Sequence, residues 1–285
     1  MKIKISKKMF VFILFCSYLV FCQSCMKMRM SPKKTKEYFT KSNTSFKDLS
    51  YKISETHQIH YIETGDSTKP TLFFIHGSPG SWDAYKTYLS DIDLQKKYRL
   101  IAIDRPGFGY SNFGEAEDLE SQAKLILPFI ESKNNNQPIT IIGHSMGGPV
   151  VVKLGTLAPK LFKNLVILAG AIDPKAETPE NWRPILMSKP IKYLIPGAFR
   201  PSNEELWWLK EDLKTMKSEL HKITSNVIII HGTEDSLVPF SNVGFMEKEF
   251  INAKKTKVLP IEKADHFIPW SHYEIIKKSL INLEN

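Results

Sequence analysis

The chain is poor in cysteine. Its 285 residues include only three, Cys16, Cys22 and Cys25, and all of them precede residue 26. The rest of the chain therefore holds no cysteine pair to oxidise, which excludes a disulfide framework. Its stability must come from a hydrophobic core. We also find no internal repeat and no low-complexity tract.

The chain also lacks a concentrated basic cluster, although its formal net charge is +9. Lys2, Lys4, Lys7 and Lys8 lie in an N-terminal leader, and no acidic residue precedes Glu37. Without these four lysines the charge is +5, spread among many Lys and Glu residues. A nucleic-acid partner leaves a dense basic face, so we expect none. The proportions of hydrophobic (42%) and charged (24%) residues are those of an ordinary globular protein.

The leader has the layout of an export signal. Basic residues through Lys8 precede the apolar run MFVFILFCSYLVFCQSC, which ends at Cys25. The run is shorter than the roughly 20 apolar residues that a spanning helix needs. A charged start followed by a short apolar run is typical of a cleaved signal. We therefore predict a signal peptide over residues 1–25.

The ending CQSC resembles a bacterial lipoprotein signal, in which a cysteine after a small residue is lipidated and becomes the new N-terminus. Ser24 is suitably small and Cys25 is the lipidation candidate, while Cys22 stands where leucine is usual. We expect a lipoprotein attached to a membrane of the bacterial cell envelope. A plain cleaved signal, giving an exported protein, and an uncleaved signal anchor are the alternatives.

The region after the leader divides into a tether and one domain. Residues 26–45 are polar and basic without apolar periodicity, and we interpret them as a tether. Residues 46–285 carry eight short strand-like segments, most of them continuous runs of Ile, Val and Leu. Runs of this kind suit strands that are buried on both faces of a parallel sheet. Helical spacing lies between them, near residues 118–132, 146–158, 241–250 and 272–283. The alternation predicts a mostly parallel eight-stranded α/β sheet with helices on both faces.

One segment interrupts this alternation. Residues 174–222 are rich in proline and contain Trp182, Trp207 and Trp208, with a helical pattern only at the end. The segment is too long for a simple connection between a helix and a strand. We predict that it is a short cap insertion over one end of the sheet.

Ser145 stands between two glycines in the sequence GHSMG, directly after an apolar run. A sharp strand-to-helix turn brings the residues two before and two after the serine together, so Gly143 and Gly147 must both lack a side chain. The helix that follows directs its N-terminal dipole and free N–H groups at the serine. Pro149 is tolerated because it falls in the first helical turn.

Four motifs in a fixed order carry a resemblance to a known family. They are HGSPG, DRPGFGYS, GHSMGG and HGTEDSLVP. From about residue 50 to the C-terminus, the chain resembles the alpha/beta-hydrolase fold family in its serine-nucleophile, esterase- and lipase-like branch. Epoxide hydrolases and haloalkane dehalogenases share the first two motifs, but resemblance to them implies an aspartate nucleophile. The serine at position 145 argues against both.

The resemblance implies a catalytic triad in the chain order serine, acid, histidine. Asp235 follows the strand-like run NVIIIHG, and His266 follows the last predicted strand. Both fall in loops at the strand ends where sheets of this type hold ligands. Some relatives place the acid after the preceding strand, where this chain has Asp173. We predict Ser145, Asp235 and His266 as the triad.

The same resemblance implies two backbone donors for an oxyanion hole. We assign them to the N–H of Met146, directly after the nucleophile, and to the N–H of Ser78 in the HGSPG loop. It also implies that His76, His144 and His231 are structural hydrogen-bonding residues. Phe108, Trp182, Trp207 and Trp208 either line an apolar acyl pocket or pack the cap onto the sheet.

These features predict a carboxylesterase that hydrolyses small or medium acyl esters through an acyl-enzyme, without a metal or other cofactor. A thioesterase, an amidase and a carbon–carbon hydrolase use the same triad and stay open. The alternative class is a non-catalytic ligand-binding protein of the same fold. The expected partners are a small ester and a membrane. The sequence does not predict the oligomeric state.

Overall fold

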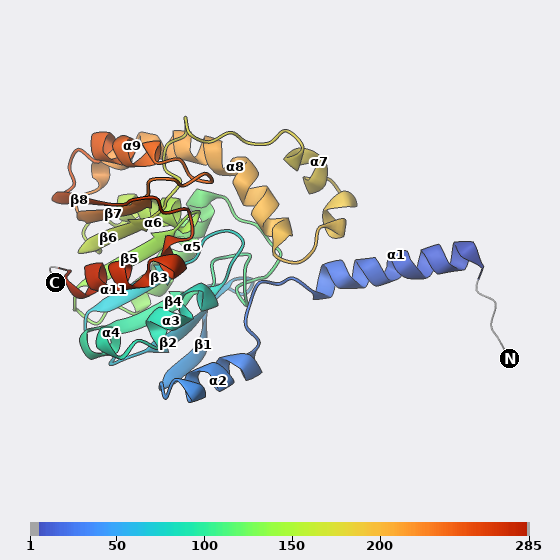
Figure 1. Cartoon of the computed structure of the whole chain (residues 1–285), viewed down its shortest axis with the longest axis horizontal. Coiled ribbons are helices and arrows are strands. Elements are labelled where there is room, and N and C mark those ends of the chain that lie inside the picture. Colours follow the sequence, from blue (N-terminus) through green and yellow to red (C-terminus); the bar gives the residue numbers. More distant parts are fainter. Residues whose placement is uncertain (1–5, 284–285) are drawn as a thin grey trace.

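The computed structural model describes residues 6–283 and is built on a twisted eight-stranded sheet (Figure 1). The spatial order of the strands is β1-β2-β4-β3-β5-β6-β7-β8. β1 and β2 pair antiparallel, as do β2 and β4, and all later pairs are parallel. The strands are β1 (Phe46–Lys52), β2 (Gln58–Thr64), β3 (Thr71–Ile75), β4 (Arg99–Ile103), β5 (Ile139–His144), β6 (Asn164–Leu168), β7 (Asn226–Gly232) and β8 (Lys255–Ile261). Each matches one of the runs expected to be strands.

Helices cover both faces of the sheet. Those of the described residues are α1 (Lys7–Ser24), α2 (Pro32–Lys41), α3 (Lys86–Leu89), α4 (Ile92–Lys97), α5 (Leu119–Ser132), α6 (Gly147–Leu157), α7 (Arg183–Met187), α8 (Phe199–Lys217), α9 (Ser241–Glu249), α10 (Ile268–Ser271) and α11 (Tyr273–Ile281). Short 3₁₀ turns are η1 (Trp82–Tyr85), η2 (Ile191–Leu194) and η3 (Leu220–Lys222). The four helices expected from the sequence correspond to α5, α6, α9 and α11. The predicted alpha/beta-hydrolase fold is confirmed.

The core consists of two apolar clusters, one on each face of the sheet. In β3, Phe73 and Ile75 belong to the cluster under α5, α6, α8 and α9. Leu72 and Phe74 belong to the cluster under α3, α4 and α11. Successive side chains of a strand point to opposite faces, so a continuous apolar run supplies both clusters. This explains why the strands lack a polar alternation.

The segment expected to be a tether differs from that expectation. Within residues 26–45, α2 is capped by Ser31, whose side chain accepts a hydrogen bond from the N–H of Lys34. Phe39 of this helix is fully buried, and its ring stacks on Phe46 at 4.6 Å and on Trp82 at 5.9 Å. The sequence pattern is too weak to predict this helix because it buries so few of its side chains.

The segment between β6 and β7 contains α7, η2, α8 and η3. α8 covers 19 residues, and Leu209, Leu213 and Met216 of this helix pack into the core cluster on one face of the sheet. The N-terminal end of α8 and the turns before it project beyond the sheet, toward α1 (Figure 1). We refer to residues 174–222 as the cap segment.

α1 extends away from the body of the molecule (Figure 1). This helix of 18 residues has the length and apolar composition to cross a membrane. It lies near the N-terminus, and a signal sequence has the same length and composition. Most of its apolar side chains are exposed, and Cys22 is the buried exception.

Candidate active site

Ser145 occupies a sharp turn between β5 and α6. Its φ angle is +53°, a left-handed conformation that is uncommon for a residue with a side chain. A Cβ atom at Gly143 would collide with the carbonyl oxygen of Gly147, and one at Gly147 would collide with the carbonyl oxygen of Ile75. Both glycines are therefore required by the turn, as the sequence pattern predicts. The local backbone is strained at Ser145, a feature that clusters at functional sites.

Asp235 and His266 meet at the carboxyl ends of β7 and β8. Asp235 Oδ2 lies 2.7 Å from His266 Nδ1, and both side chains are almost fully buried. The other carboxylate oxygen accepts hydrogen bonds from the N–H groups of Leu237 and Val238, at 2.9 and 2.8 Å. Burial alone would raise the pKa of Asp235, but hydrogen bonds from His231, His266 and Val238 outweigh it and hold the pKa well below its usual range. Asp235 is therefore an anion that faces an imidazole N–H.

Two further histidines support this pair. His144 Nε2 donates to the carbonyl oxygen of His266 at 2.9 Å, and the two rings lie 4.7 Å apart. Burial first, and then the neighbouring His266, lower the pKa of His144 to about 3, so it is neutral. His231 Nε2 donates to the carbonyl oxygen of Val238 at 2.9 Å and lies 3.5 Å from Asp235 Oδ2. Both serve as hydrogen-bonding supports.

Ser145 directly follows His144, so the serine and His266 lie at the same edge of the sheet. Among the described residues, no hydrogen bond joins the Ser145 hydroxyl to His266. Catalytic hydrogen bonds are often long in a ligand-free site and tighten when substrate binds. Ser145 is partly exposed, whereas its neighbours on either side are buried.

The HGSPG loop packs against the serine. A Cβ atom at Gly77 would lie 3.1 Å from the Cβ of Ser145. His76 fixes this loop, because its Nε2 accepts the N–H of Arg105 at 3.0 Å while its Nδ1 donates to the carbonyl oxygen of Gly77 at 2.7 Å. Burial, reinforced by the charge of Arg105, holds the pKa of His76 well below its usual range. Within residues 6–283, the backbone N–H groups of Ser78 and Met146 donate to no other residue.

Arg105 joins this loop to the cap segment. Its guanidinium forms two hydrogen bonds with the carboxylate of Glu205 in α8, at 2.7 and 2.9 Å, and both side chains are sealed from solvent. The same guanidinium donates to the carbonyl oxygens of His76 and Gly77, at 2.9 and 3.1 Å. A second contact joins Ser78 Oγ to Ser202 Oγ at 2.8 Å. Reasoning from the sequence missed Glu205 and Ser202, because nothing in their local pattern marks them.

The residues predicted for an acyl pocket do not lie together. Phe108 is buried against His76 and Arg105, next to the HGSPG loop. Trp207 and Trp208 line a surface cavity of about 450 Å³ between α8 and residues 116–118. Trp182 is 49% exposed on the cap segment, with the guanidinium of Arg183 over its ring. Of these four residues, these contacts place only Phe108 beside the HGSPG loop.

Asp173, the alternative acid, forms a different set of contacts. Its carboxylate accepts the N–H of Lys175 at 2.9 Å, and its own N–H donates to Asn242 at 2.7 Å. Asp265 likewise accepts the N–H of Phe267 at 2.9 Å. Both carboxylates cap turns of the backbone. Asp235 is the carboxylate that contacts His266.

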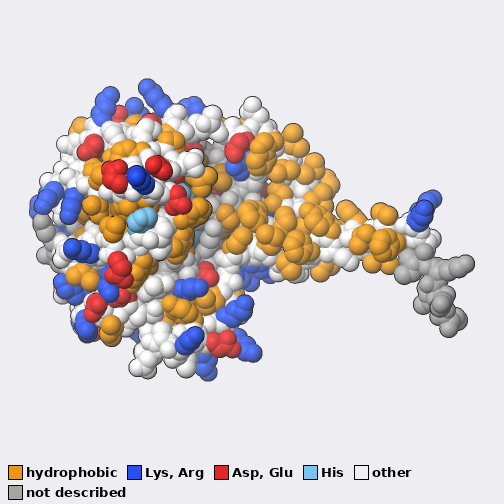
Figure 2. All heavy atoms as spheres, viewed as in Figure 1, with side chains coloured by type: hydrophobic (Ala, Val, Ile, Leu, Met, Phe, Trp, Pro, Cys, Tyr) orange, Lys and Arg blue, Asp and Glu red, His pale blue; other side chains and the backbone are white. Residues whose placement is uncertain are grey.

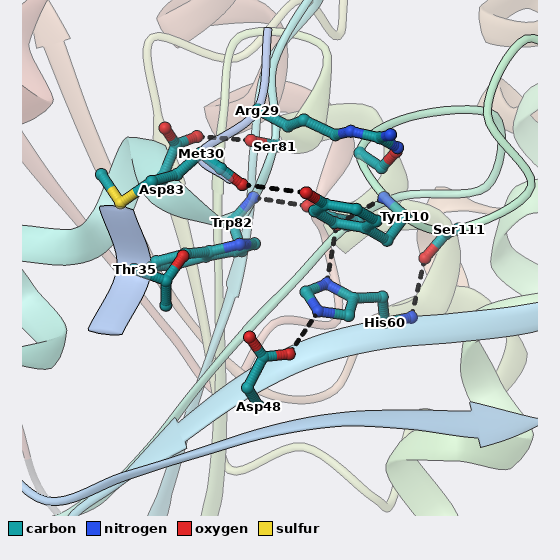
Figure 3. A network of polar contacts seen from close by, with 12 residues as sticks. Arg29, Met30, Thr35, Asp48, His60, Ser81, Trp82, Asp83, Tyr110 and Ser111 are labelled. Atoms are coloured by element: carbon teal, nitrogen blue, oxygen red, sulfur yellow. Dashed lines mark hydrogen bonds and ion pairs between the residues drawn. The ribbon is translucent and has the colours of Figure 1, made fainter. Parts of the chain in front are cut away.

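A second polar network surrounds His60 of β2, next to the end of β4 (Figure 3). The ring of His60 is held between Asp104 and Asp48, with a distance of 2.8 Å on each side. Burial would lower the pKa of His60, but the two carboxylates outweigh it and raise the pKa above its usual value. Asp104 also accepts the N–H of Trp82 at 2.7 Å. The network braces the loop after β4, because Asp104 also accepts the N–H of Tyr110 at 2.8 Å.

Across the described residues, no group of His, Cys, Asp and Glu side chains is arranged to hold a metal ion.

Comparison with known proteins agrees with the fold. A family model described as alpha/beta hydrolase fold matches residues 70–191. The chain is 30% identical over 259 residues to an uncharacterized hydrolase, YugF, of Bacillus subtilis, with 78% of this chain and 91% of YugF covered. The chain belongs to the alpha/beta hydrolase fold family.

Other relatives carry names of specific activities. A bifunctional esterase/perhydrolase of Acinetobacter calcoaceticus is 25% identical over 78% of this chain and 94% of its own length. Epoxide hydrolase 1 of Caenorhabditis elegans is 30% identical over 112 residues, which cover 38% of this chain and 27% of that enzyme. The chain also spans only 31% and 44% of two further relatives, epoxide hydrolase 4 of mouse and an esterase/lipase of Haemophilus influenzae. These partial matches fall short of whole-protein similarity.

Solved structures show the same fold at low sequence identity. An esterase from Exiguobacterium antarcticum superposes with a TM-score of 0.67 at 18% identity, covering 82% of this chain and 98% of its own. A bacterial membrane phospholipase A superposes with a TM-score of 0.64 at 19% identity, covering 96% and 97%.

Proposed function

We propose that this protein is a serine hydrolase that cleaves carboxylic esters through an acyl-enzyme, with Ser145 as nucleophile, His266 as general base and Asp235 as orienting acid. The observation that carries the proposal is the 2.7 Å contact between Asp235 and His266 Nδ1, at the edge of the sheet where Ser145 stands on a strained turn. The esterase names among the relatives support the reaction class.

In the proposed mechanism each proton has a defined donor and acceptor. Asp235 accepts the Nδ1 proton of His266, which leaves Nε2 as the unprotonated nitrogen that takes the proton of Ser145. The Ser145 oxygen then attacks the ester carbonyl, and the protonated His266 gives its proton to the departing alcohol. Water then attacks the acyl-enzyme while His266 takes a proton from it, and His266 returns that proton to the departing Ser145 oxygen. Free acid is released and the Ser145 hydroxyl is restored.

The negative charge on the carbonyl oxygen needs donors that are otherwise unused. The N–H groups of Ser78 and Met146 meet that requirement, since neither donates to another described residue. The start of α6 adds its N-terminal dipole at the same point. Loss of one such donor typically costs about 3–4 kcal/mol in the transition state. The backbone therefore performs this part of the chemistry.

The resemblance to epoxide hydrolases does not lead us to propose epoxide hydrolysis as a second function. Those matches cover less than half of this chain, and the elbow carries Ser145 where the resemblance implies an aspartate. Thioester, amide and carbon–carbon substrates use the same residues, and a substrate series separates them from esters. For location, we propose attachment to a membrane of the bacterial cell envelope, with Cys25 lipidated; a retained α1 would give attachment at the same point of the chain.

The proposal is tested with Ser145→Ala and a p-nitrophenyl ester. We expect turnover to be abolished and the thermal midpoint to stay nearly unchanged, because Ser145 serves chemistry and not packing. A fluorophosphonate probe should label the wild type at Ser145 and leave the variant unlabelled. Retention of more than about a few per cent of the activity in the variant would show that another nucleophile acts.

A further inference from the structure

The cap segment has an exposed apolar face beside α1. Trp182, Ile185, Tyr193 and Phe199 are exposed by 49%, 61%, 41% and 39%. We call these four residues the cap apolar face. Figure 2 shows apolar side chains running without interruption from α1 onto the adjoining part of the body. A contiguous apolar surface of this kind marks an interaction site, because single exposed apolar residues do not gather in this way.

The cap segment is joined to the last turns of α1 by hydrogen bonds. The hydroxyl of Tyr18 and the thiol of Cys22 both donate to the carbonyl oxygen of Leu194, at 2.9 and 3.1 Å. Gln23 Nε2 donates to the carbonyl oxygen of Tyr193 at 2.9 Å. The N–H of Gly197 donates to the carbonyl oxygen of Cys22 at 3.0 Å. From Tyr18 to Ser24 the rise along the helix axis is about 9 Å. The contact with the cap segment spans that depth.

The stretch of the cap segment that contacts α1 carries basic residues and no acidic ones. No acidic residue lies between Glu180 and Glu204, and none precedes Glu37. The cap segment carries Arg183, Lys189, Lys192 and Arg200 in the first of these intervals. Arg183 and Lys192 pair with the flanking Glu180 and Glu204, while Lys189 is exposed. Exposed aromatic side chains with an exposed lysine among them suit a membrane interface that carries anionic lipid.

We propose that the cap apolar face binds the headgroup region of an anionic phospholipid bilayer at the point where α1 enters it. As a helix of 18 residues, α1 is about 27 Å long, close to the roughly 30 Å of a hydrocarbon core. The cap segment contacts its last 9 Å or so, which agrees with the 5–10 Å depth at which interfacial segments are buried. Lys7 and Lys8 flank the other end of the helix.

The same placement holds if Cys25 carries the anchor. Cys25 is exposed and directly follows α1, and the next residue, Met26, accepts the N–H of Ala198 at 2.9 Å. Acyl chains on Cys25 would therefore enter the bilayer beside the cap apolar face. The bilayer lies against this face whether α1 is retained or replaced by acyl chains.

The cap apolar face lies close to the proposed oxyanion loop. Phe199 belongs to the face, and Ser202, three residues later in α8, contacts the hydroxyl of Ser78 at 2.8 Å. Three residues of helix rise by about 4.5 Å. Esters dissolved in the bilayer thus reach the site over one turn of α8. This route for the substrate rests on the proposed function, whereas the docking of the face on the bilayer does not.

Docking is tested first without any activity measurement. The full chain is reconstituted in phosphatidylcholine vesicles, with or without phosphatidylglycerol, and tryptophan fluorescence is quenched by brominated lipid. Wild type should lose more fluorescence than Trp182→Phe, and more with phosphatidylglycerol present. Equal quenching of the two proteins would overturn the proposal. So would cross-linking that shows Trp182 covered by a second copy of the chain.

Activity then tests the route to the site. We expect Ile185→Ser/Tyr193→Ser/Phe199→Ser to reduce hydrolysis of p-nitrophenyl palmitate in vesicles about tenfold, while p-nitrophenyl acetate in solution changes less than about twofold. Ile92→Ser/Ile251→Ser removes equally exposed apolar groups elsewhere and should change neither rate. Parallel loss of both rates at an unchanged thermal midpoint, or equal loss in the control, would overturn the proposal. Absence of hydrolysis by wild type contradicts the proposed function alone, because quenching still reports docking.

Discussion

Glu205 and Arg105 form a bidentate ion pair between positions one hundred residues apart, and neither side chain reaches solvent. Arg105 also donates to the carbonyl oxygens of His76 and Gly77 and to the side-chain oxygen of Gln122. The cap segment thereby helps to fix the loop that carries Ser78. A buried pair of this kind is costly to break, because the partner that stays behind is an uncompensated charge.

Glu205→Gln should therefore impair both folding and turnover. We expect a loss of about 3–5 kcal/mol in the free energy of unfolding, measured with urea. In the molecules that remain folded, kcat should fall more than KM rises, since a displaced Ser78 N–H weakens binding of the transition state alone. Glu180→Gln breaks the pair between the half-exposed Glu180 and Arg183 and should change stability by less than about 1 kcal/mol. A purely structural role for Glu205 would leave kcat of the folded fraction unchanged.

Asp235→Asn should reduce turnover by about four orders of magnitude, as loss of the orienting acid does in serine proteases. The carboxylate accepts the Nδ1 proton of His266, and an amide in its place favours the wrong tautomer. Asp173→Asn keeps an oxygen for the N–H of Lys175 and should cost less than about tenfold. Steady-state kinetics of both variants decide the matter. If the two effects are reversed, the acid follows β6.

Asp212 should make stability depend on pH. Burial first, and then the charges of Asp118, Glu205 and Glu211, raise its pKa from 3.8 to about 6, against a hydrogen bond from the N–H of Leu119. The folded chain therefore binds more protons than the unfolded chain between these values, so stability falls as pH rises through that window.

Asp212→Asn removes this charge and should stabilise the protein near neutral pH, by on the order of 1 kcal/mol after allowance for solvent screening of a half-buried group. Urea unfolding on both sides of the window measures the difference. The gain should disappear at pH values below about 4. Glu247→Gln on the exposed face of α9 provides a control in which a surface carboxylate is removed. A pH-independent gain would assign the effect to packing.

Cys25→Ser should move the protein from the detergent phase to the aqueous phase, or leave it unprocessed, without loss of esterase activity. Lipidation needs a thiol at the cleavage point, and acyl chains contribute about 0.8 kcal/mol per buried CH₂ to membrane binding. Cys16→Ser in the same leader should leave processing unchanged. A mass spectrum with an unmodified mature N-terminus would refute lipidation and favour a plain signal or a retained α1.

The sequence predicted those parts of the molecule whose local pattern repeats what the structure requires. Continuous apolar runs predicted the strands because both faces of the sheet are covered, and Gly143 and Gly147 predicted the turn because a side chain at either collides with backbone. Glu205 could not be found in this way. A carboxylate within a charged helical stretch has the pattern of a solvated face, and its partner is set by the tertiary fold alone. α2 was missed because Phe39 anchors it almost by itself.

The supports of the proposed triad and those of the oxyanion loop come from different parts of the chain. Gly143, Gly147 and His144 hold Ser145 and His266 from the sheet side, and within residues 6–283 no hydrogen bond or ion pair connects the cap segment to the triad. Ser202 of the cap segment contacts Ser78 directly, and Glu205 contacts Arg105, which holds the same loop, and Gln122 of α5. Changes in the cap segment away from Glu205 and Ser202 can therefore accumulate during evolution, while the contacts of the proposed proton relay are inherited unchanged.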